Sequence, residues 1–256
     1  MMMSNIIITG ANQGIGYCFI EQLLKEGNRI AVLDLETNNL SKLKTAYADK
    51  LLYFKVDVRN QKELQDAVSE TVVSFHTLDI AIHNACRCTF DMEVNTDFTT
   101  YQDVFDVNFF GALRLVKAVL PYMSKQKRGK VIFTSSGVGV TGFLGISPYA
   151  STKGALESLA KCLNLEYVKD NISFHIFHPP LTRTQSSAPL PIPKEFMAEP
   201  DKVGKGLAKH VQSKRFIICN SLGQKIQIIG CYLFPLKIGR FLSKKISSLC
   251  STSRNY

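Results

Sequence analysis

Short apolar runs alternate with longer segments of helical periodicity through most of this chain. Six runs lie at 5–9, 29–34, 51–56, 78–83, 130–134 and 172–178, and a seventh candidate lies at 216–219. Nearly continuous apolar runs of this length are typical of strands that are buried on both faces of a parallel sheet. Strands that alternate with helices are joined by right-handed crossovers. The pattern therefore predicts an α/β fold with a doubly wound parallel sheet.

The size of the chain fits a single domain followed by a distinct tail. It has 256 residues, of which 45% are hydrophobic and 20% are charged, which is enough to bury a full core. The rhythm of strands and helices breaks at 179–200, where six of the 9 prolines gather. This segment follows the sixth predicted strand, so we expect a substrate loop or lid there. The predicted division is a domain at 1–220 and a basic extension at 221–256.

The basic charge of the chain is confined to this extension. The net charge is +10, but residues 1–200 contain 20 basic and 20 acidic side chains, so that the whole excess falls after residue 200. Such asymmetry predicts an anionic partner, either a membrane surface or a nucleic acid. A solvated tail without any partner is the alternative. Aromatic residues do not alternate with the basic ones, which argues against nucleic acid.

The extension itself has the pattern of a short basic amphipathic helix. Its uncharged run at 226–236 is too short to span a bilayer. Beyond this run, one helical face carries Ile238, Phe241, Leu242, Ile246 and Leu249, and another carries Lys237, Arg240 and Lys244. A helix of this kind can lie on an anionic membrane. It can equally pack on its own domain or on a neighbouring subunit, and both interpretations stay open.

The cysteine and histidine patterns predict no metal site. The 7 cysteines are scattered, and Cys86 and Cys88 lack a second pair that would complete a zinc site. His175 and His178 alternate along a predicted strand without a third ligand, so we expect core histidines. An odd cysteine count without a signal peptide predicts a reducing, cytoplasmic location.

Three glycines form a candidate dinucleotide loop. Gly10, Gly14 and Gly16 follow a predicted strand and open a predicted helix, which is the context that such a loop requires. The helix N-terminus then offers N–H donors and the positive end of its dipole to a pyrophosphate. A plain strand-to-helix turn is the alternative. Asp34 ends the second strand, where a carboxylate accepts from a ribose 2′-hydroxyl and repels a 2′-phosphate. NAD(H) is therefore favoured over NADP(H).

A tyrosine and a lysine suggest acid–base chemistry. Tyr149 and Lys153 are four residues apart and share one helix face. An ammonium beside a phenol favours the phenolate and lowers the pKa of the tyrosine. Ser136 lies thirteen residues before Tyr149, and Asn108 lies further upstream. The ordered set is far more specific than the Tyr–Lys pair alone.

Together these motifs resemble the short-chain dehydrogenase/reductase family over about residues 5–220. The matching pieces are Thr9 to Gly16, Asn84-Ala85, Asn108, Ser135-Ser136, Tyr149 with Lys153, and Pro179 with Thr184. The resemblance implies a Rossmann fold and an NAD(P)-dependent oxidoreductase that interconverts an alcohol and a ketone or aldehyde. It also implies a homodimer or homotetramer and a small-molecule substrate that can be lipophilic.

The resemblance assigns roles to single residues. Tyr149 is implied as the general acid/base, while Lys153 binds the nicotinamide ribose and lowers the pKa of Tyr149. Ser136 is implied to hydrogen-bond the substrate oxygen, and Asn108 to hold a water in the proton relay. The implied cofactor-binding set is Gly10, Asn12, Gln13, Gly14, Ile15, Gly16, Asp34, Asp57, Val58, Asn84, Ala85, Tyr149, Lys153, Pro179 and Thr184.

Two departures from the family pattern keep other functions open. The family usually has Asn-Asn-Ala-Gly where this chain has His83 to Cys86, and Cys86 replaces a glycine that lets the backbone pass close to the cofactor. The family usually has Pro-Gly where this chain has Pro179-Pro180, which is similar to 3-ketodihydrosphingosine reductases. The alternatives are a lipid-ketone reductase at a membrane surface and a dinucleotide sensor without turnover.

Overall fold

A single parallel sheet forms the centre of the molecule. The computed structural model describes residues 3–190 and 192–252, with side chains up to residue 244. The sheet order is β3-β2-β1-β4-β5-β6-β7, and every neighbouring pair is parallel. The strands are β1 (Asn5–Thr9), β2 (Arg29–Asp34), β3 (Leu51–Lys55), β4 (Ile80–His83), β5 (Gly129–Thr134), β6 (Ile172–His178) and β7 (Ile217–Cys219). The predicted doubly wound sheet is confirmed, with strand ends shifted by two residues or fewer.

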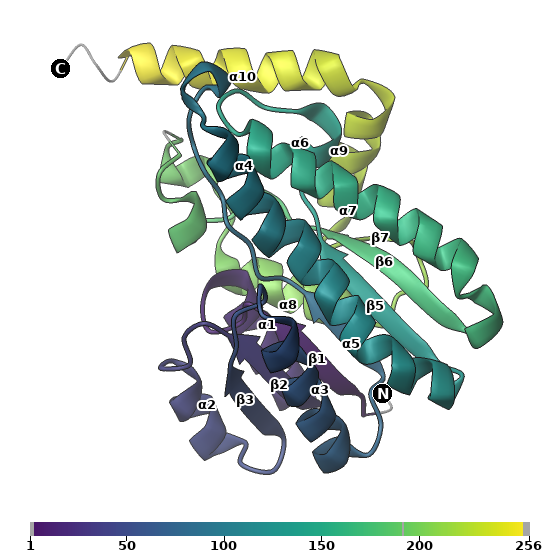
Figure 1. Cartoon of the computed structure of the whole chain (residues 1–256). Coiled ribbons are helices and arrows are strands. Elements are labelled where there is room, and N and C mark those ends of the chain that lie inside the picture. The colour runs from purple at the N-terminus through teal and green to yellow at the C-terminus, as the bar shows by residue number, and fades with distance from the viewer. Residues whose placement is uncertain (1–2, 191, 253–256) are drawn as a thin grey trace.

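Helices cover both faces of this sheet (Figure 1). One apolar core lies under α3 (Gln61–Phe75), α5 (Gly111–Gln126) and α7 (Ser147–Glu166). The other lies under α1 (Gly14–Lys25), α2 (Leu40–Ala46) and α8 (Pro200–His210). Strands buried on both sides need apolar residues at nearly every position, which explains the continuous runs in the sequence.

The helix that leads into α5 contains a wide turn. The helix α4 (Phe98–Phe105) continues through the π-helical turn η2 (Asp106–Phe110) directly into α5. Such turns are rare and occur often at functional sites. The buried Asn108 lies within this turn.

The segment 179–200 folds back on itself beyond β6. It contains the short turns η4 (Gln185–Ser187) and η5 (Lys194–Phe196). Thr182 and Ala198 form an isolated parallel bridge, and Arg183 pairs with Glu199 at 2.7 Å. These contacts hold the two ends of the segment together. The remaining short turns are η1 (Glu93–Asn95) and η3 (Val168–Asp170).

The basic extension forms two helices at one end of the molecule. The helix α9 (Leu222–Leu233) buries Ile228 and Cys231, and α10 (Pro235–Thr252) crosses above it and above α6 (Val138–Thr141) (Figure 1). Proline begins α10 because it lacks the N–H that a first helical residue leaves unpaired. The two helices pack on the domain, and a boundary after residue 220 stays a prediction.

Only part of the predicted apolar face of α10 is turned toward the domain. Ile238 and Leu242 are half-buried, whereas Phe241 is exposed. The side chains of Ile246 and Leu249 lie outside the described residues. Among the described residues, no helix has the length and apolar character needed to cross a membrane.

Candidate active site

A pocket of about 780 Å³ opens at the carboxyl ends of the strands, which is where doubly wound sheets bind ligands. Every predicted site residue except Asn108 lines it. These are Gly10, Asn12, Gln13, Gly14, Ile15, Gly16, Asp34, Asp57, Val58, Asn84, Ala85, Ser136, Tyr149, Lys153, Pro179 and Thr184. Residues that are up to 174 positions apart in the sequence thus meet at one edge of the sheet.

Two glycines of the loop are packed too tightly to be replaced by a residue with a side chain. Gly10 has a φ of +69°, and a Cβ on it would lie 2.5 Å from the Cα of Ala85. A Cβ on Gly16 would lie 2.5 Å from the Gly10 carbonyl oxygen. The amide of Asn84 donates to this same carbonyl and accepts from the Thr134 hydroxyl at 3.2 Å. The loop is therefore fixed before any ligand arrives, and its bare backbone faces the pocket.

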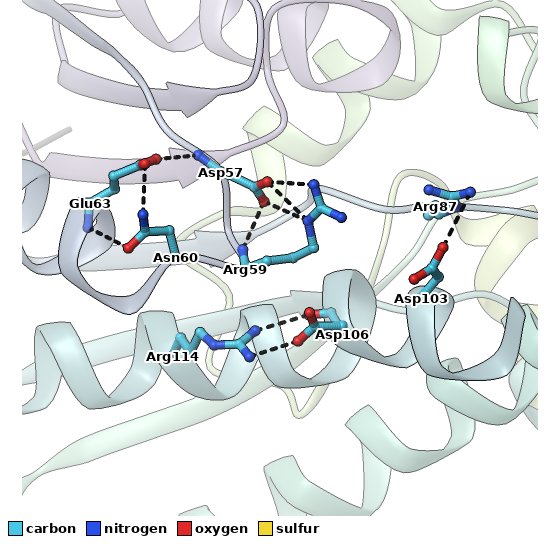
Figure 2. Close-up of polar contacts among 8 residues, drawn as sticks. All are labelled: Asp57, Arg59, Asn60, Glu63, Arg87, Asp103, Asp106 and Arg114. Carbon is cyan, nitrogen blue, oxygen red and sulfur yellow. Dashed lines mark hydrogen bonds and ion pairs between the residues drawn. The ribbon is translucent and has the colours of Figure 1, made fainter. Parts of the chain in front are cut away.

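The acidic end of the pocket is built from two strand ends. One carboxylate oxygen of Asp34 accepts from the Asn12 backbone N–H at 2.8 Å, and the other accepts from the Glu36 N–H at 3.3 Å. Asp57 is held by Arg59, whose guanidinium donates at 2.6 Å and lowers the pKa of the Asp57 carboxyl. Figure 2 shows Arg59 folded over Asp57. The Arg59 cation, which lines this end of the pocket, is therefore already paired.

A second ion pair lies close to this end of the pocket. The Arg114 guanidinium donates to the Asp106 carboxylate at 2.7 Å, and Figure 2 shows this pair beneath the Asp57 turn. The Glu63 carboxylate accepts from the Asp57 backbone N–H at 2.9 Å. The Glu63 contact ties the turn after β3 to α3 and leaves the Asp57 side chain facing Arg59.

Tyr149, Lys153 and Ser136 meet at the opposite end of the pocket. The Nζ of Lys153 donates to the Thr134 carbonyl at 2.8 Å and lies 5.2 Å from the centre of the Tyr149 ring. Burial lowers the pKa of Lys153. Burial, reinforced by Cys86 and Cys88, raises the pKa of Tyr149 well above its usual value, and a hydrogen bond with Ser136 opposes this rise.

The structure therefore differs from the expected effect of Lys153 on Tyr149. The pKa of the phenol was predicted to fall, but burial raises it, and the Lys153 ammonium bonds to the Thr134 carbonyl. The phenol is consequently protonated at neutral pH, which is the form that can donate a proton.

Asn108 lies behind the pocket wall instead of lining it. It is fully buried, its amide oxygen accepts from the Arg87 N–H at 2.7 Å, and its amide nitrogen donates to the Arg87 carbonyl at 2.9 Å. It also donates to the Thr152 hydroxyl at 3.0 Å. Asn108 therefore fixes the segment after β4 against α7. The wide turn η2 places its side chain there.

The residues that depart from the family pattern are accommodated without opening the fold. Burial, together with the charge of Lys153, lowers the pKa of His83 to about 3, so its ring is neutral. Its Nδ1 lies 3.0 Å from the Thr9 hydroxyl. Cys86 is exposed and lines the pocket, and Pro180 lines it beside Pro179. His175, one of the two histidines on β6, is satisfied by the Arg215 carbonyl at 2.7 Å and the Ser173 hydroxyl at 2.9 Å.

One group of hydrogen-bonded polar residues next to the pocket was not predicted as a unit. Ser135, Glu157, His178 and Tyr232 converge there from four different elements. The spacing of Glu157 one helical turn after Lys153 was the only local signal, and it is shared by many surface residues. Among the described residues, no group of three metal-ligating side chains forms a metal site.

Comparison with known proteins identifies the family. A short chain dehydrogenase family model matches residues 4–194. The chain belongs to this family. It is 31% identical over 186 residues to a 2-(R)-hydroxypropyl-CoM dehydrogenase of Xanthobacter autotrophicus, covering 70% of this chain and 74% of that protein. It is 25% identical to the 3-ketodihydrosphingosine reductase of Bos taurus, covering 91% and 76%.

Solved structures share the same fold. A short-chain dehydrogenase from Streptomyces avermitilis aligns with a TM-score of 0.79 at 21% identity, covering 99% of this chain and 98% of that chain. ElxO with NADP bound aligns at 0.74 with 21% identity, covering 86% and 95%. A 3-ketoacyl-(acyl-carrier-protein) reductase from Brucella melitensis complexed with NADH aligns at 0.75 with 17% identity, covering 85% and 94%. The fold of this family binds NAD(P).

Proposed function

We propose that this short-chain dehydrogenase is an NAD(H)-dependent oxidoreductase that interconverts an alcohol and a ketone or aldehyde. The observation that carries the proposal is the meeting of Ser136, Tyr149 and Lys153 in the pocket that also contains the glycine loop. The side-chain-free cradle at Gly10 and Gly16 fits a pyrophosphate that approaches the backbone closely. The nicotinamide, when bound, would supply or accept the hydride.

The residues of the chain would handle the proton and the orientation of the substrate. The Ser136 hydroxyl would hydrogen-bond the substrate oxygen, and Tyr149 would donate a proton to it during reduction. Lys153 would bind the nicotinamide ribose through the ammonium that now contacts the Thr134 carbonyl. Asn108 would act from behind, by holding the segment that carries Arg87.

Two measurements test the proposal. Binding is measured by titrating the protein with NADH and with NADPH. Turnover is then followed by the absorbance of the reduced nicotinamide with a panel of sterols, long-chain ketones, retinoids and sugars. We expect binding and turnover of at least one alcohol or ketone. Tight binding without turnover across the panel would instead support a dinucleotide sensor.

The acidic end of the pocket leads to a prediction about cofactor choice. We expect the native protein to bind NADH about tenfold more tightly than NADPH, because the Asp34 carboxylate would repel a 2′-phosphate. Arg59 cannot compensate, since it is paired with Asp57. Asp34→Ala combined with Leu35→Arg should reverse the preference, because Leu35 is exposed and lines the pocket. Leu35→Arg alone is the control, and tighter binding of NADPH by the native protein would contradict the prediction.

We propose in addition that the outer face of α9 and α10 lies on an anionic membrane surface. Large apolar side chains are exposed there, namely Leu233, Phe234, Leu236 and Phe241. Lys237, Arg240 and Lys244 are exposed among them, in the region that holds the whole charge excess. Apolar side chains beside basic ones fit the boundary between lipid headgroups and acyl chains.

This surface predicts a salt-dependent association with vesicles. Lys244→Gln should weaken binding to phosphatidylserine-containing vesicles about fivefold at low salt, since one basic residue contributes about 1 kcal/mol there. The effect should shrink as ionic strength rises. Lys42→Gln on the exposed surface of α2 is the matched control. Binding measured by vesicle sedimentation that is equal for both variants, or insensitive to salt, would refute the proposal.

A further inference from the structure

A buried carboxylate joins the C-terminal helix α9 to the back of the proposed active site. The Glu157 cluster consists of Ser135, Glu157, His178 and Tyr232. Glu157 is 5% exposed and His178 is 0% exposed. A charge at this depth requires partners, because its desolvation is costly.

The cluster supplies those partners from four elements. The Ser135 hydroxyl, at the end of β5, lies 2.9 Å from one carboxylate oxygen, and His178 Nε2, at the end of β6, lies 3.1 Å from it. The hydroxyl of Tyr232, on α9, donates to the other oxygen. Burial alone would raise the pKa of Glu157, but these contacts, led by that of His178, lower it instead. The carboxylate is therefore the stable form.

Three members of the cluster adjoin a residue of the proposed site. Ser135 precedes Ser136, and its hydroxyl also lies 3.2 Å from the carbonyl oxygen of Lys153. Glu157 follows Lys153 by one helical turn on α7. His178 is the last residue of β6, immediately before the pocket-lining Pro179. A shift of the carboxylate would thus be transmitted to the residues around the pocket.

The segment that follows Ser136 is enclosed between α7 and the C-terminal helices. A Cβ on Gly137 would lie 3.4 Å from the Cδ1 of Ile228 on α9. A Cβ on Gly139 would lie 2.8 Å from the Cβ of Lys153, on the opposite side. Further along, a Cβ on Gly239 of α10 would lie 2.5 Å from the Thr141 carbonyl oxygen. Close contacts with α7 on one side and with the C-terminal helices on the other restrict the movement of this segment.

We propose that Tyr232 and Glu157 are positioning residues of the active site, through which α9 fixes the Ser136 hydroxyl relative to Tyr149 and Lys153. The inference rests on the proposed function for its effect on turnover. Neither residue touches the substrate pocket. Their role is to hold Ser135, and with it the backbone from which the Ser136 side chain projects.

The test compares Tyr232→Phe with Tyr47→Phe. The first variant removes only the hydroxyl that donates to Glu157. The second makes the same change in a half-buried tyrosine at the end of α2, away from the pocket. We expect Tyr232→Phe to lower kcat about ten- to a hundredfold, as small misplacements of reacting groups do. The dissociation constant for NADH should stay within about twofold of the native value, since the glycine loop is untouched.

A second readout does not depend on turnover. In Tyr232→Phe, the amides of residues 135–142 should exchange with deuterium faster than in Tyr47→Phe, because local opening there loses its restraint. Glu157→Gln, which keeps the side-chain shape, should show the same two changes. A lower Tm with native kcat and native exchange would overturn the proposal, because α9 would then only stabilise the fold. If the native protein shows no turnover at all, the proposed function fails, and the exchange rates alone decide the role of the cluster.

Discussion

Tyr149→Phe is expected to lower kcat about a hundred- to ten-thousand-fold, which is the usual contribution of a general acid or base. The substitution keeps the ring and its contact with Lys153, whose Nζ lies 5.2 Å from the ring centre. It removes only the hydroxyl that bonds to Ser136 and would give up its proton. The affinity for NADH should therefore remain close to that of the native protein.

The measurement is a steady-state assay with the best substrate of the panel, together with a binding titration. Tyr53→Phe, on the edge strand β3, serves as the matched control. If Tyr149→Phe kept a near-native kcat, Tyr149 would not be the proton donor, whatever the family pattern implies. A joint loss of kcat and cofactor binding would point to a collapsed pocket and would equally contradict the assigned role.

Gly10→Ala is expected to cost about 1–3 kcal/mol in overpacking alone, and to weaken NADH binding more than tenfold. The added Cβ would lie 2.5 Å from the Cα and 2.6 Å from the N of Ala85, and backbone atoms cannot move aside as the end of a side chain can. The left-handed φ of +69° adds strain for any residue with a Cβ. The loop would have to shift away from the pyrophosphate position.

Gly27→Ala is the control that separates the effect of backbone strain from the effect of the steric clash with Ala85. Gly27 also has a left-handed φ, of +91°, but the nearest atom to its added Cβ would be the Met3 sulfur at 3.8 Å. Both variants should lose free energy of unfolding, measured in urea, and only Gly10→Ala should lose cofactor affinity. Equal cofactor affinity in the two variants would mean that the loop does not contact the dinucleotide.

The sheet and the pocket could be predicted because each depends on a local pattern. A strand that is buried on both faces must be apolar throughout, so runs such as 172–178 could be located to the residue. Gly10, Asp34 and Tyr149 occur at strand ends or on a helix with known spacing, and the parallel topology brings those positions to one edge. The positions of these residues follow from the order of the elements rather than from fine packing.

The contacts behind the pocket could not be predicted in this way. Tyr232 and Glu157 are 75 residues apart, and nothing in a helical glutamate indicates that it will be buried with three partners. The side chain of Asn108 is buried because the residue lies in the π-helical turn η2. The wider turn changes which side chains of the helix face inward. Likewise, Phe241 was predicted on the apolar face of α10 but is exposed, because a sequence pattern does not reveal which side of a helix meets its neighbour.

The residues of the pocket and the residues that support it from α9 are synthesised at different times. Thr184 lies beside the glycine loop, since a Cβ on Gly14 would be 3.3 Å from its side chain. The residues that line the pocket end at Leu190, so all of them are synthesised before Tyr232. A nascent chain can therefore assemble the dinucleotide cradle first and gain the support behind Ser136 only at the end.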